Sequence, residues 1–389
     1  MRLVVLTATE LTRDARARRQ LSAARRLGLD VVGVSGLASG EPPMPVEGVE
    51  IHRVGPQGRV RRDPLGDAPQ RRVIVREVFG LLRLARLVVR TARLARGTAT
   101  AGSVDIVHAN DRDTLPAGWL VARRKRARLV YDAHELYSAF EQHPPRLATA
   151  VLTALERALA RRVDAVVTVS DALAEELTNV LRLRRRPLVV ANAPELRARE
   201  PAHGDGPLRA VYQGAFGPGR YPEDFLDALA EAPGVTLAIR VVGVDADTLR
   251  ADVERRGLAE RVTVLAPVAP DELVGALDGC DVGLIVDRPR TRNSELSFPN
   301  RLFDYLMAGL AVVTSRLGAV SSFVEAENVG VVFAPGKPSE LAARLRELDA
   351  DRPRLAELQR RARDLAVSRF NAEAQDAVLA DAWGVSASS

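Results

Sequence analysis

One acidic residue inside an apolar helix is the feature of this chain with the clearest chemistry. Residues 297–313 read Ser-Phe-Pro-Asn-Arg-Leu-Phe-Asp-Tyr-Leu-Met-Ala-Gly-Leu-Ala-Val-Val, with Asp304 in the middle. The pattern predicts a polar loop broken by Pro299, then a helix, a glycine stop and a short strand. The first N–H groups of a helix have no internal partner and bind phosphate, and a carboxylate one turn further in can accept two ribose hydroxyls. The segment therefore predicts a binding site for a nucleoside diphosphate.

A glycine-rich turn precedes this segment in the chain. Residues 211–220 read Val-Tyr-Gln-Gly-Ala-Phe-Gly-Pro-Gly-Arg, which predicts a strand that runs into a turn, a cation at Arg220 and a helix from about Pro222. Glycines such as Gly214 let the backbone approach a phosphate, and a guanidinium neutralises it. Alone, the segment also fits a plain turn before a surface helix. Its place ahead of Asp304 favours the phosphate-binding interpretation.

A third polar cluster ends a predicted strand in the first half. Residues 130–137 read Val-Tyr-Asp-Ala-His-Glu-Leu-Tyr, which places Asp132, His134 and Glu135 at the carboxyl end of a parallel strand, where ligand sites form. No second His or Cys stands at ligand spacing, so no metal site is expected here. Asp111 and Asp113 form an Asp-x-Asp that also resembles a metal motif. We expect them instead to cap the helix that follows.

The elements that position these residues alternate between strand and helix, which predicts parallel, doubly wound α/β sheets. A stretch rich in Pro and Gly, residues 193–207, predicts a linker between two such halves, with a ligand cleft at the carboxyl ends of their strands. Ser170 and Asp171 are expected to cap a helix. The strands expected in the first half are Arg2–Leu6, Asp30–Val34, Val104–His108, Leu129–Asp132, Ala165–Val169 and Leu188–Ala191. Those expected in the second are Arg209–Gly214, Thr236–Gly243, Arg261–Leu265, Asp281–Ile285, Ala311–Thr314 and Gly330–Phe333.

Taken in order, the motifs resemble those of retaining GT-B glycosyltransferases of family 4. The matching segments are the loop 7–16, Asp-x-His-Glu at 132–135, Asn-x-Pro at 192–194, the glycine loop and residues 298–305. The resemblance implies two Rossmann-like domains that face each other across a cleft, with bounds 1–193 and 208–371 joined by the linker 194–207. It also implies that the last segment, 372–389, forms a helix that returns to the first domain.

The resemblance also implies roles for single residues in sugar transfer from a nucleoside-diphosphate sugar to a hydroxyl. Asp304 would hold the ribose, and His134 would meet the donor sugar or its β-phosphate. Neither a cofactor nor a metal is implied, and the departing phosphate would take the acceptor proton. The residues implied to face the donor diphosphate are Gly214, Arg220, Pro299, Asn300 and Arg301, and those implied to border the acceptor are Arg13, Asp111, Asp132 and Glu135.

Two positions depart from the family pattern. The family's two acidic positions are separated by seven residues, so the first of them falls on Leu296 here, and Glu295 is the nearest candidate for it. Ala215 replaces a phosphate-binding arginine, which Arg301 could compensate. These departures keep open a non-catalytic protein of the same fold that binds nucleotide sugars. A sugar-nucleotide epimerase is a further alternative.

Charge divides the chain. Residues 1–198 carry 34 Lys and Arg against 21 Asp and Glu, whereas the remainder is acidic. A basic half fits an anionic acceptor, an anionic membrane surface or an ordinary solvated surface. Residues 71–96 predict an amphipathic helix whose apolar stripe packs on the core, with peripheral membrane contact as the alternative. The members of the stripe are Val75, Val78, Phe79, Leu82, Ala85 and Val89.

Composition limits the class of protein and the cellular compartment that can be expected. The pI near 10.0 would suit nucleic acid, but no basic motif with interleaved aromatic residues supports it. One cysteine, Cys280, excludes a disulfide framework within the chain, and no signal peptide or membrane-spanning run is apparent. We therefore expect a cytoplasmic enzyme that acts on a nucleotide sugar, with membrane contact limited to the periphery.

Overall fold

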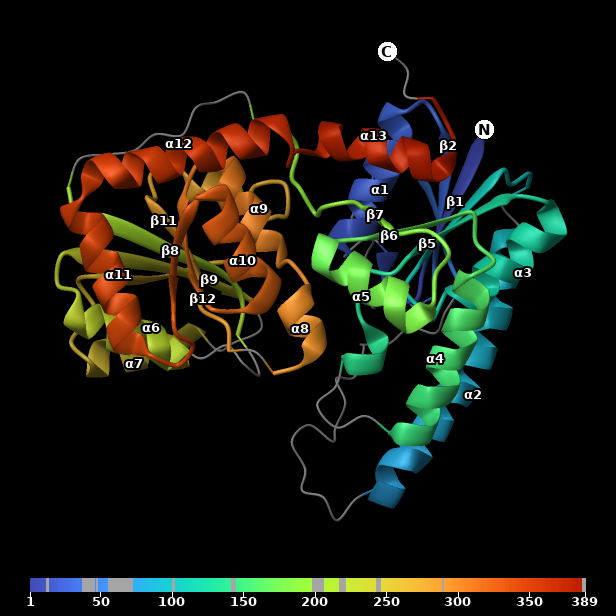
Figure 1. Cartoon of the computed structure of the whole chain (residues 1–389), viewed down its shortest axis with the longest axis horizontal. Helices are drawn as coiled ribbons and strands as arrows, with labels where there is room; N and C mark the ends of the chain where they lie inside the picture. The colour runs from blue at the N-terminus through green and yellow to red at the C-terminus, as the bar shows by residue number, and fades with distance from the viewer. Residues whose placement is uncertain are drawn as a thin grey trace. The chain divides into compact units, whose positions relative to one another are not determined.

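The computed structural model describes residues 1–11, 14–36, 46, 48–54, 73–99, 102–140, 145–197, 206–216, 222–242, 246–288 and 290–386; of 73–81, 83, 84, 99 and 242 it describes the backbone alone. Contacts divide the chain into two compact units (Figure 1). The first unit comprises Met1–Ala191 with Gln375–Ser389. The second comprises Asn192–Ala374.

The first unit is built on a parallel sheet of seven strands in the order β3-β2-β1-β4-β5-β6-β7. The chain order reverses between β1 and β4, which makes their carboxyl ends a switch point. The strands are β1 (Arg2–Thr7), β2 (Asp30–Ser35), β3 (Glu50–Arg53), β4 (Ile106–Asn110), β5 (Arg128–Asp132), β6 (Ala165–Thr168) and β7 (Leu188–Val189). The helices are α1 (Ala15–Arg26), α2 (Val73–Ala99), α3 (Leu115–Lys125), α4 (Arg146–Ala160), α5 (Asp171–Leu181) and α13 (Ala372–Trp383), with a 3-10 turn at Tyr137–Ala139.

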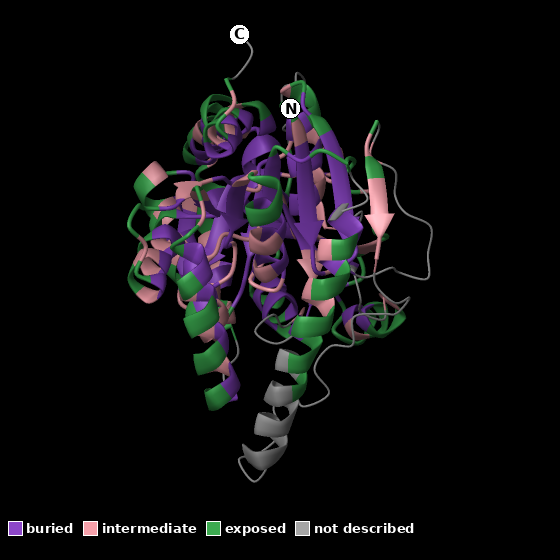
Figure 2. Cartoon of the chain, turned by 90° about the vertical axis from the view of Figure 1, so that its right-hand side faces the viewer, coloured by how far each residue is buried: buried purple, intermediate pink, exposed green. Residues whose placement is uncertain are grey.

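The central strands of this sheet are covered on both faces, so they carry unbroken apolar runs rather than alternating ones. Every residue of β1 after Arg2 is buried, and Figure 2 shows the central strands in the colour of buried residues. The last helix of the chain completes this core. Leu379, Ala382 and Trp383 of α13 pack with Leu3 and Val5 of β1.

The second unit repeats the plan with six parallel strands in the order β10-β9-β8-β11-β12-β13, and its switch point lies between β8 and β11. The strands are β8 (Leu208–Ala215), β9 (Val235–Val242), β10 (Val262–Leu265), β11 (Val282–Ile285), β12 (Ala311–Ser315) and β13 (Gly330–Phe333). The helices are α6 (Pro222–Glu231), α7 (Ala246–Arg255), α8 (Arg292–Leu296), α9 (Asn300–Met307), α10 (Gly318–Glu327), α11 (Pro338–Ala350) and α12 (Arg352–Ser368), with a 3-10 turn at Gly275–Leu277.

The two strand orders confirm the predicted class, doubly wound parallel α/β sheets. The predicted cap of α5 is also confirmed, because Ser170 accepts a hydrogen bond from the Leu173 N–H. The predicted capping of α3 by Asp111 and Asp113 is wrong. Thr114 is the N-cap, and both carboxylates are taken by side chains elsewhere.

The predicted core face of α2 is also wrong where side chains are described. Leu82, Ala85 and Val89 are exposed, and the residues that pack inward are Leu87 and Leu94. The stripe lies on the opposite side of the helix from the buried residues, because the sequence is apolar on more than one face. The side chains of Val75, Val78 and Phe79 lie outside the described ones. None of the described helices combines the length and apolarity needed to cross a bilayer.

Candidate functional site

Asp304 lies in a short helix of the second unit, as the local sequence predicts. Helix α9 begins at Asn300 after the extended Pro299, and the chain leaves the helix through Gly309, whose φ is 67°. The apolar face of α9 packs inward, with Leu302 and Leu306 fully buried. Asp304 sits in the second turn and is 4% exposed.

Gln213, the residue before the glycine turn, binds both Asp304 and its neighbour. Its side-chain amide donates to Asp304 Oδ2 at 3.2 Å, and its backbone N–H donates to the Tyr305 hydroxyl at 3.1 Å. The same hydroxyl donates to the carbonyl of Leu284 at 3.3 Å. The ends of β8 and β11 and the second turn of α9 are therefore held together around one carboxylate.

A buried ion pair stands beside the glycine turn. Arg301 Nη2 lies 2.5 Å from Asp287 Oδ2, and the two side chains are 6% and 10% exposed. Burial opposes the charge of Arg301, but the carboxylate of Asp287 outweighs it and raises the pKa of the guanidinium. Arg301 also lies over the ring of Tyr212, 5.2 Å from its centroid, and its Nε is buried with no hydrogen-bond partner among the described residues.

Gly214 is required next to this guanidinium. Its φ of 147° is disfavoured for other residues, and a Cβ there would lie 3.1 Å from Arg301 Nη1. The turn therefore brings bare backbone up to a fixed cation.

The remaining candidates for donor binding in the second unit are Asn300, Glu295 and Arg220. Asn300 begins α9, and its side-chain oxygen accepts from Asn192 Nδ2 at 2.9 Å. Glu295 lies on α8, where its carboxylate pairs with Arg292 at 3.0 Å. Arg220 lies outside the described residues.

The first unit holds a buried carboxylate one strand away from its switch point, at the end of β5. Asp132 ends β5 and is 0% exposed. Its Oδ2 accepts from Arg16 Nε at 2.7 Å and from Gln20 Nε2 at 2.6 Å, both on α1. Burial opposes ionisation, but Arg16, His108 and His134 outweigh it and hold the pKa of Asp132 well below its ordinary value. Asp132 therefore acts on a ligand only through these neighbours.

His134 lies between two carboxylates. Its Nδ1 is 3.4 Å from Asp132 Oδ1, and its Nε2 is 3.1 Å from Asp111 Oδ1. Burial favours the neutral ring, but the two carboxylates prevail and raise the pKa of His134 to about 9. The ring is therefore an imidazolium at neutral pH, with one N–H toward each carboxylate.

Asp111 is held in turn by its surroundings. Its φ of 68° is unusual for a residue other than glycine, and its carboxylate accepts a hydrogen bond from the Tyr137 hydroxyl. Burial raises its pKa. Asp113, two residues on, pairs with Arg90 of α2.

His108 links this cluster to the end of the chain. The indole N–H of Trp383 donates to His108 Nδ1 at 2.9 Å, so the proton of the neutral ring is on Nε2, which faces Asp132 at 3.5 Å.

The structure thus brings Asp111, Asp132 and His134 together, as their place at strand ends indicates. Glu135 is half-buried in the same loop, and Arg13 lies outside the described residues. Within the described ranges, no group of three or more His, Cys, Asp or Glu has a geometry that would hold a metal ion.

Sequence reasoning missed several members of both clusters. In the first unit these are Arg16, Gln20, His108 and Trp383. In the second they are Gln213 and Asp287. Gln213 and Asp287 lie at or just beyond the carboxyl ends of β8 and β11, so their position at the switch point was an available signal. No feature of the sequence around Trp383 indicates that it belongs to the cluster.

Two family models match this chain. Residues 16–193 match the model described as Glycosyltransferase Family 4, and residues 211–351 match the one described as Glycosyl transferases group 1. No curated protein sequence matches at a significant level.

Solved structures share the fold over the whole chain. HepE (Alr3699) of Anabaena, solved with UDP, is 18% identical, with a TM-score of 0.69 over 99% of this chain and 100% of its own. Sucrose-phosphate synthase of Thermosynechococcus elongatus is 16% identical, with a TM-score of 0.71 over 99% of this chain and 98% of its own. WaaG, a glycosyltransferase involved in lipopolysaccharide biosynthesis, is 13% identical, with a TM-score of 0.64 over the full length of both chains. Together with the family matches, this fold identifies the chain as a family 4-like glycosyltransferase of the GT-B type.

Proposed function

We propose that this glycosyltransferase moves a sugar from a nucleoside-diphosphate sugar to an acceptor hydroxyl, with retention of configuration and without a metal ion. The observation that carries the proposal is the cluster at the switch point of the second unit, where Asp304, Gly214 and Arg301 meet at the start of α9. HepE, whose fold this chain shares, has been solved with UDP and with UDP-glucose.

In this proposal the second unit binds the donor. Asp304 accepts the ribose hydroxyls, and the free N–H groups that begin α9 bind the diphosphate. Arg301 lies beside Gly214 and supplies positive charge there, together with Arg220. Stabilising the departing diphosphate in this way lowers the barrier to breaking the bond between the anomeric carbon and the phosphate oxygen.

The first unit contributes His134 and the acceptor side. The two carboxylates beside His134 raise its pKa to about 9, so in this proposal the protonated ring stabilises negative charge on the sugar phosphate. Asp111, Glu135 and Arg13 border the acceptor. The acceptor oxygen bonds to the anomeric carbon on the face that the phosphate leaves, and the acceptor proton passes to the departing phosphate. No protein base is required for these steps.

The first unit also suits an anionic surface. Its basic excess supports an anionic acceptor or peripheral contact with the inner face of a membrane, and we propose a cytoplasmic location.

Burial raises the pKa of the Cys280 thiol to about 11, so the only cysteine is a poor nucleophile and redox partner.

Thermal unfolding with UDP, GDP, dTDP and ADP tests the donor site. A ligand that binds only the folded state adds about 2.7 kcal/mol of stability at about a hundred times its Kd. We expect one nucleotide to raise the Tm selectively and Asp304→Ala to abolish the shift. Asp278→Ala is the matched control, because Asp278 pairs with Arg197 on the surface of the same unit and its loss should leave the shift intact.

Release of the nucleoside diphosphate from the matching sugar nucleotide then separates catalysis from binding. Release by the wild-type chain that is lost in Asp304→Ala supports transfer. A nucleotide shift with no release, with or without acceptors, would favour the non-catalytic binding protein suggested by Leu296 and Ala215. No shift with any nucleotide would reject the donor site itself.

A further inference from the structure

Helix α4 has an outward face without charge. After Arg146, its exposed positions are Leu147, Ala150, Val151, Ala154, Leu155 and Ala158. The exposed fractions of the three large side chains, Leu147, Val151 and Leu155, are 60%, 44% and 38%. A surface helix in water normally turns polar residues outward. The outward face of α4 therefore suits an apolar environment.

Helix α2 packs against α4 and also exposes large apolar side chains. Leu82, Val88 and Val89 are exposed there by 45%, 70% and 48%. Six of the ten large hydrophobic side chains that the described chain exposes therefore lie on these two helices, a clustering that marks an interaction site. We name Leu82, Val88, Val89, Leu147, Val151 and Leu155 the α2–α4 face. Figure 2 looks toward this side of the first unit and shows exposed residues along both helices.

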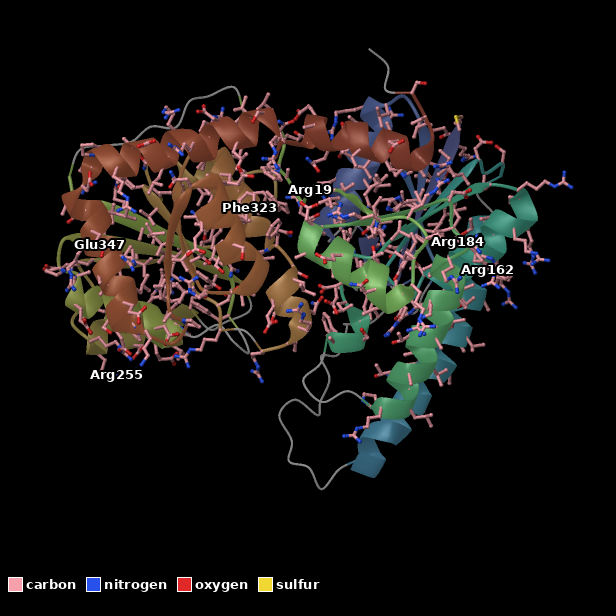
Figure 3. All side chains as sticks on the ribbon, viewed as in Figure 1. Arg19, Arg162, Arg184, Arg255, Phe323 and Glu347 are labelled. Atoms are coloured by element: carbon pink, nitrogen blue, oxygen red, sulfur yellow. The ribbon has the colours of Figure 1, made fainter. Side chains whose placement is uncertain are left out.

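Arginines lie within and beside the α2–α4 face, because Arg86 and Arg93 fall at helical spacing from Leu82 and Val89. Arg86 and Arg93 are exposed on α2, and Arg161 and Arg162 are exposed directly after α4 (Figure 3, where Arg162 is labelled). The glutamate of α4, Glu156, is buried and accepts a hydrogen bond from Tyr131, so it adds no charge to the surface.

The neighbouring helix α5 exposes two acids. These are Asp171, which pairs with Arg186, and Glu175. Among the side chains that the structure describes there, the charge next to the α2–α4 face is thus mainly that of arginines.

We propose that the α2–α4 face docks on the surface of an anionic lipid bilayer. Leu147, Val151 and Leu155 would lie at the boundary between headgroups and acyl chains, and the arginines would bind lipid phosphates. A second copy of the chain fits less well, because a two-fold contact through this face would bring arginines opposite arginines. The inference rests on the membrane contact proposed above and gives it a location, but it does not depend on sugar transfer.

Co-sedimentation of the full-length chain with vesicles tests this proposal. The vesicles contain either phosphatidylcholine alone or equal parts of phosphatidylcholine and phosphatidylglycerol. We expect binding to the mixed vesicles and much weaker binding to the neutral ones. The triple variant Leu147→Gln/Val151→Gln/Leu155→Gln should lower the partition coefficient at least about tenfold, since each change removes apolar surface from the contact. The matched control is Leu196→Gln/Val367→Gln, which changes side chains 45% and 43% exposed in the second unit and should have no effect.

The arginines are tested separately. Arg161→Gln/Arg162→Gln should weaken binding to the mixed vesicles about fivefold for each charge, because one arginine near an anionic surface contributes about that factor. Arg360→Gln/Arg361→Gln is the control, since it removes two exposed charges from α12 of the second unit. Equal binding of the wild type to both kinds of vesicle, or unchanged binding of the triple variant, would overturn the proposal.

Two further readouts separate the remaining explanations. A concentration-dependent dimer in the absence of vesicles that the triple variant abolishes would assign the face to a second copy and overturn the lipid assignment. The Tm shift with nucleotide should be the same in the wild type and the triple variant. Vesicle binding without any nucleotide shift would reject the proposed donor site and leave the lipid-binding face standing.

Discussion

The side-chain amide of Gln213 lies 3.2 Å from Asp304 Oδ2, so one hydrogen bond joins the carboxyl end of strand β8 to the second turn of helix α9. The backbone N–H of Gln213 binds the next residue of α9, Tyr305. Gln213 therefore sets the orientation of the carboxylate that we propose to hold the ribose. Its own role is that of a positioning residue.

Gln213→Leu should weaken binding of the nucleotide that stabilises the wild-type chain by about tenfold to a hundredfold. A hydrogen bond to a charged group contributes about 1.5–3 kcal/mol, and the leucine leaves Asp304 without it. Titration calorimetry gives the Kd. Gln359→Leu is the control, because Gln359 is also buried and donates to the backbone of Asp281, so its loss should cost stability and leave the Kd unchanged. An unchanged Kd in Gln213→Leu would remove Gln213 from the site.

Arg301→Met should destabilise the chain by about 3–5 kcal/mol, because it removes one partner of an ion pair in which both side chains are buried. The double variant Arg301→Met/Asp287→Leu should recover most of that loss, since an apolar pair replaces a buried ion pair at little net cost. Chemical denaturation of the two variants and the wild type measures both effects.

Nucleotide binding distinguishes a structural from a functional Arg301. If Arg301 supplies the cation beside Gly214, the double variant is stable and still binds nucleotide far more weakly than the wild type. Arg209→Met breaks a different ion pair of the second unit, between Arg209 of β8 and Asp281, and should lower stability while the Kd stays constant. Full binding by the double variant would show that Arg301 serves the fold alone.

Stability should fall between about pH 6.5 and pH 9 because of His134. Its pKa is raised to about 9 in the folded chain, above its ordinary value of 6.5, so the folded state binds the proton more tightly than the unfolded state. The stabilisation is complete below pH 6.5 and is lost as the pH rises through 9. Its upper limit is about 3 kcal/mol. Denaturation at a series of pH values should show this slope in the wild type and not in His134→Gln.

Glu156 must be separated from His134 in that experiment. Burial raises the pKa of Glu156 to about 7, so its ionisation also opposes folding as the pH rises. The comparison is therefore made in a Glu156→Gln background. A His134→Gln variant with the same slope as its parent would contradict the imidazolium assignment.

Trp383→Phe should cost about 1–3 kcal/mol, because His108 Nδ1 loses its buried donor. Trp383→Ala should cost about 3–5 kcal/mol, since it also empties a fully buried site in the first unit. Urea unfolding measures both. Trp119→Phe changes the other, half-buried tryptophan and should cost less than either. Equal stability of Trp383→Phe and the wild type would mean that the histidine finds another donor.

Features that depend on near neighbours along the chain can be predicted from the sequence alone. The alternation of apolar runs with helical segments gave the doubly wound class, because parallel strands buried on both faces need no alternation of polarity. The loop, helix and strand around Asp304 could be predicted because Pro299, Gly309 and the apolar residues between them act locally. The same local reasoning failed for α2, whose apolar residues lie on more than one face, so periodicity could not decide which side is buried.

Tertiary structure decided the partners of the functional side chains. Arg16 meets Asp132 across 116 residues, and Trp383 meets His108 across 275, because the strand order brings β1, β4 and β5 together and α13 completes the core beside them. No spacing in the sequence encodes these distances. The charge state of His134 follows from two carboxylates that only the folded sheet places on either side of its ring. The same is true of the outward face of α4, since whether an apolar side chain meets the core or the surroundings depends on what packs against the helix.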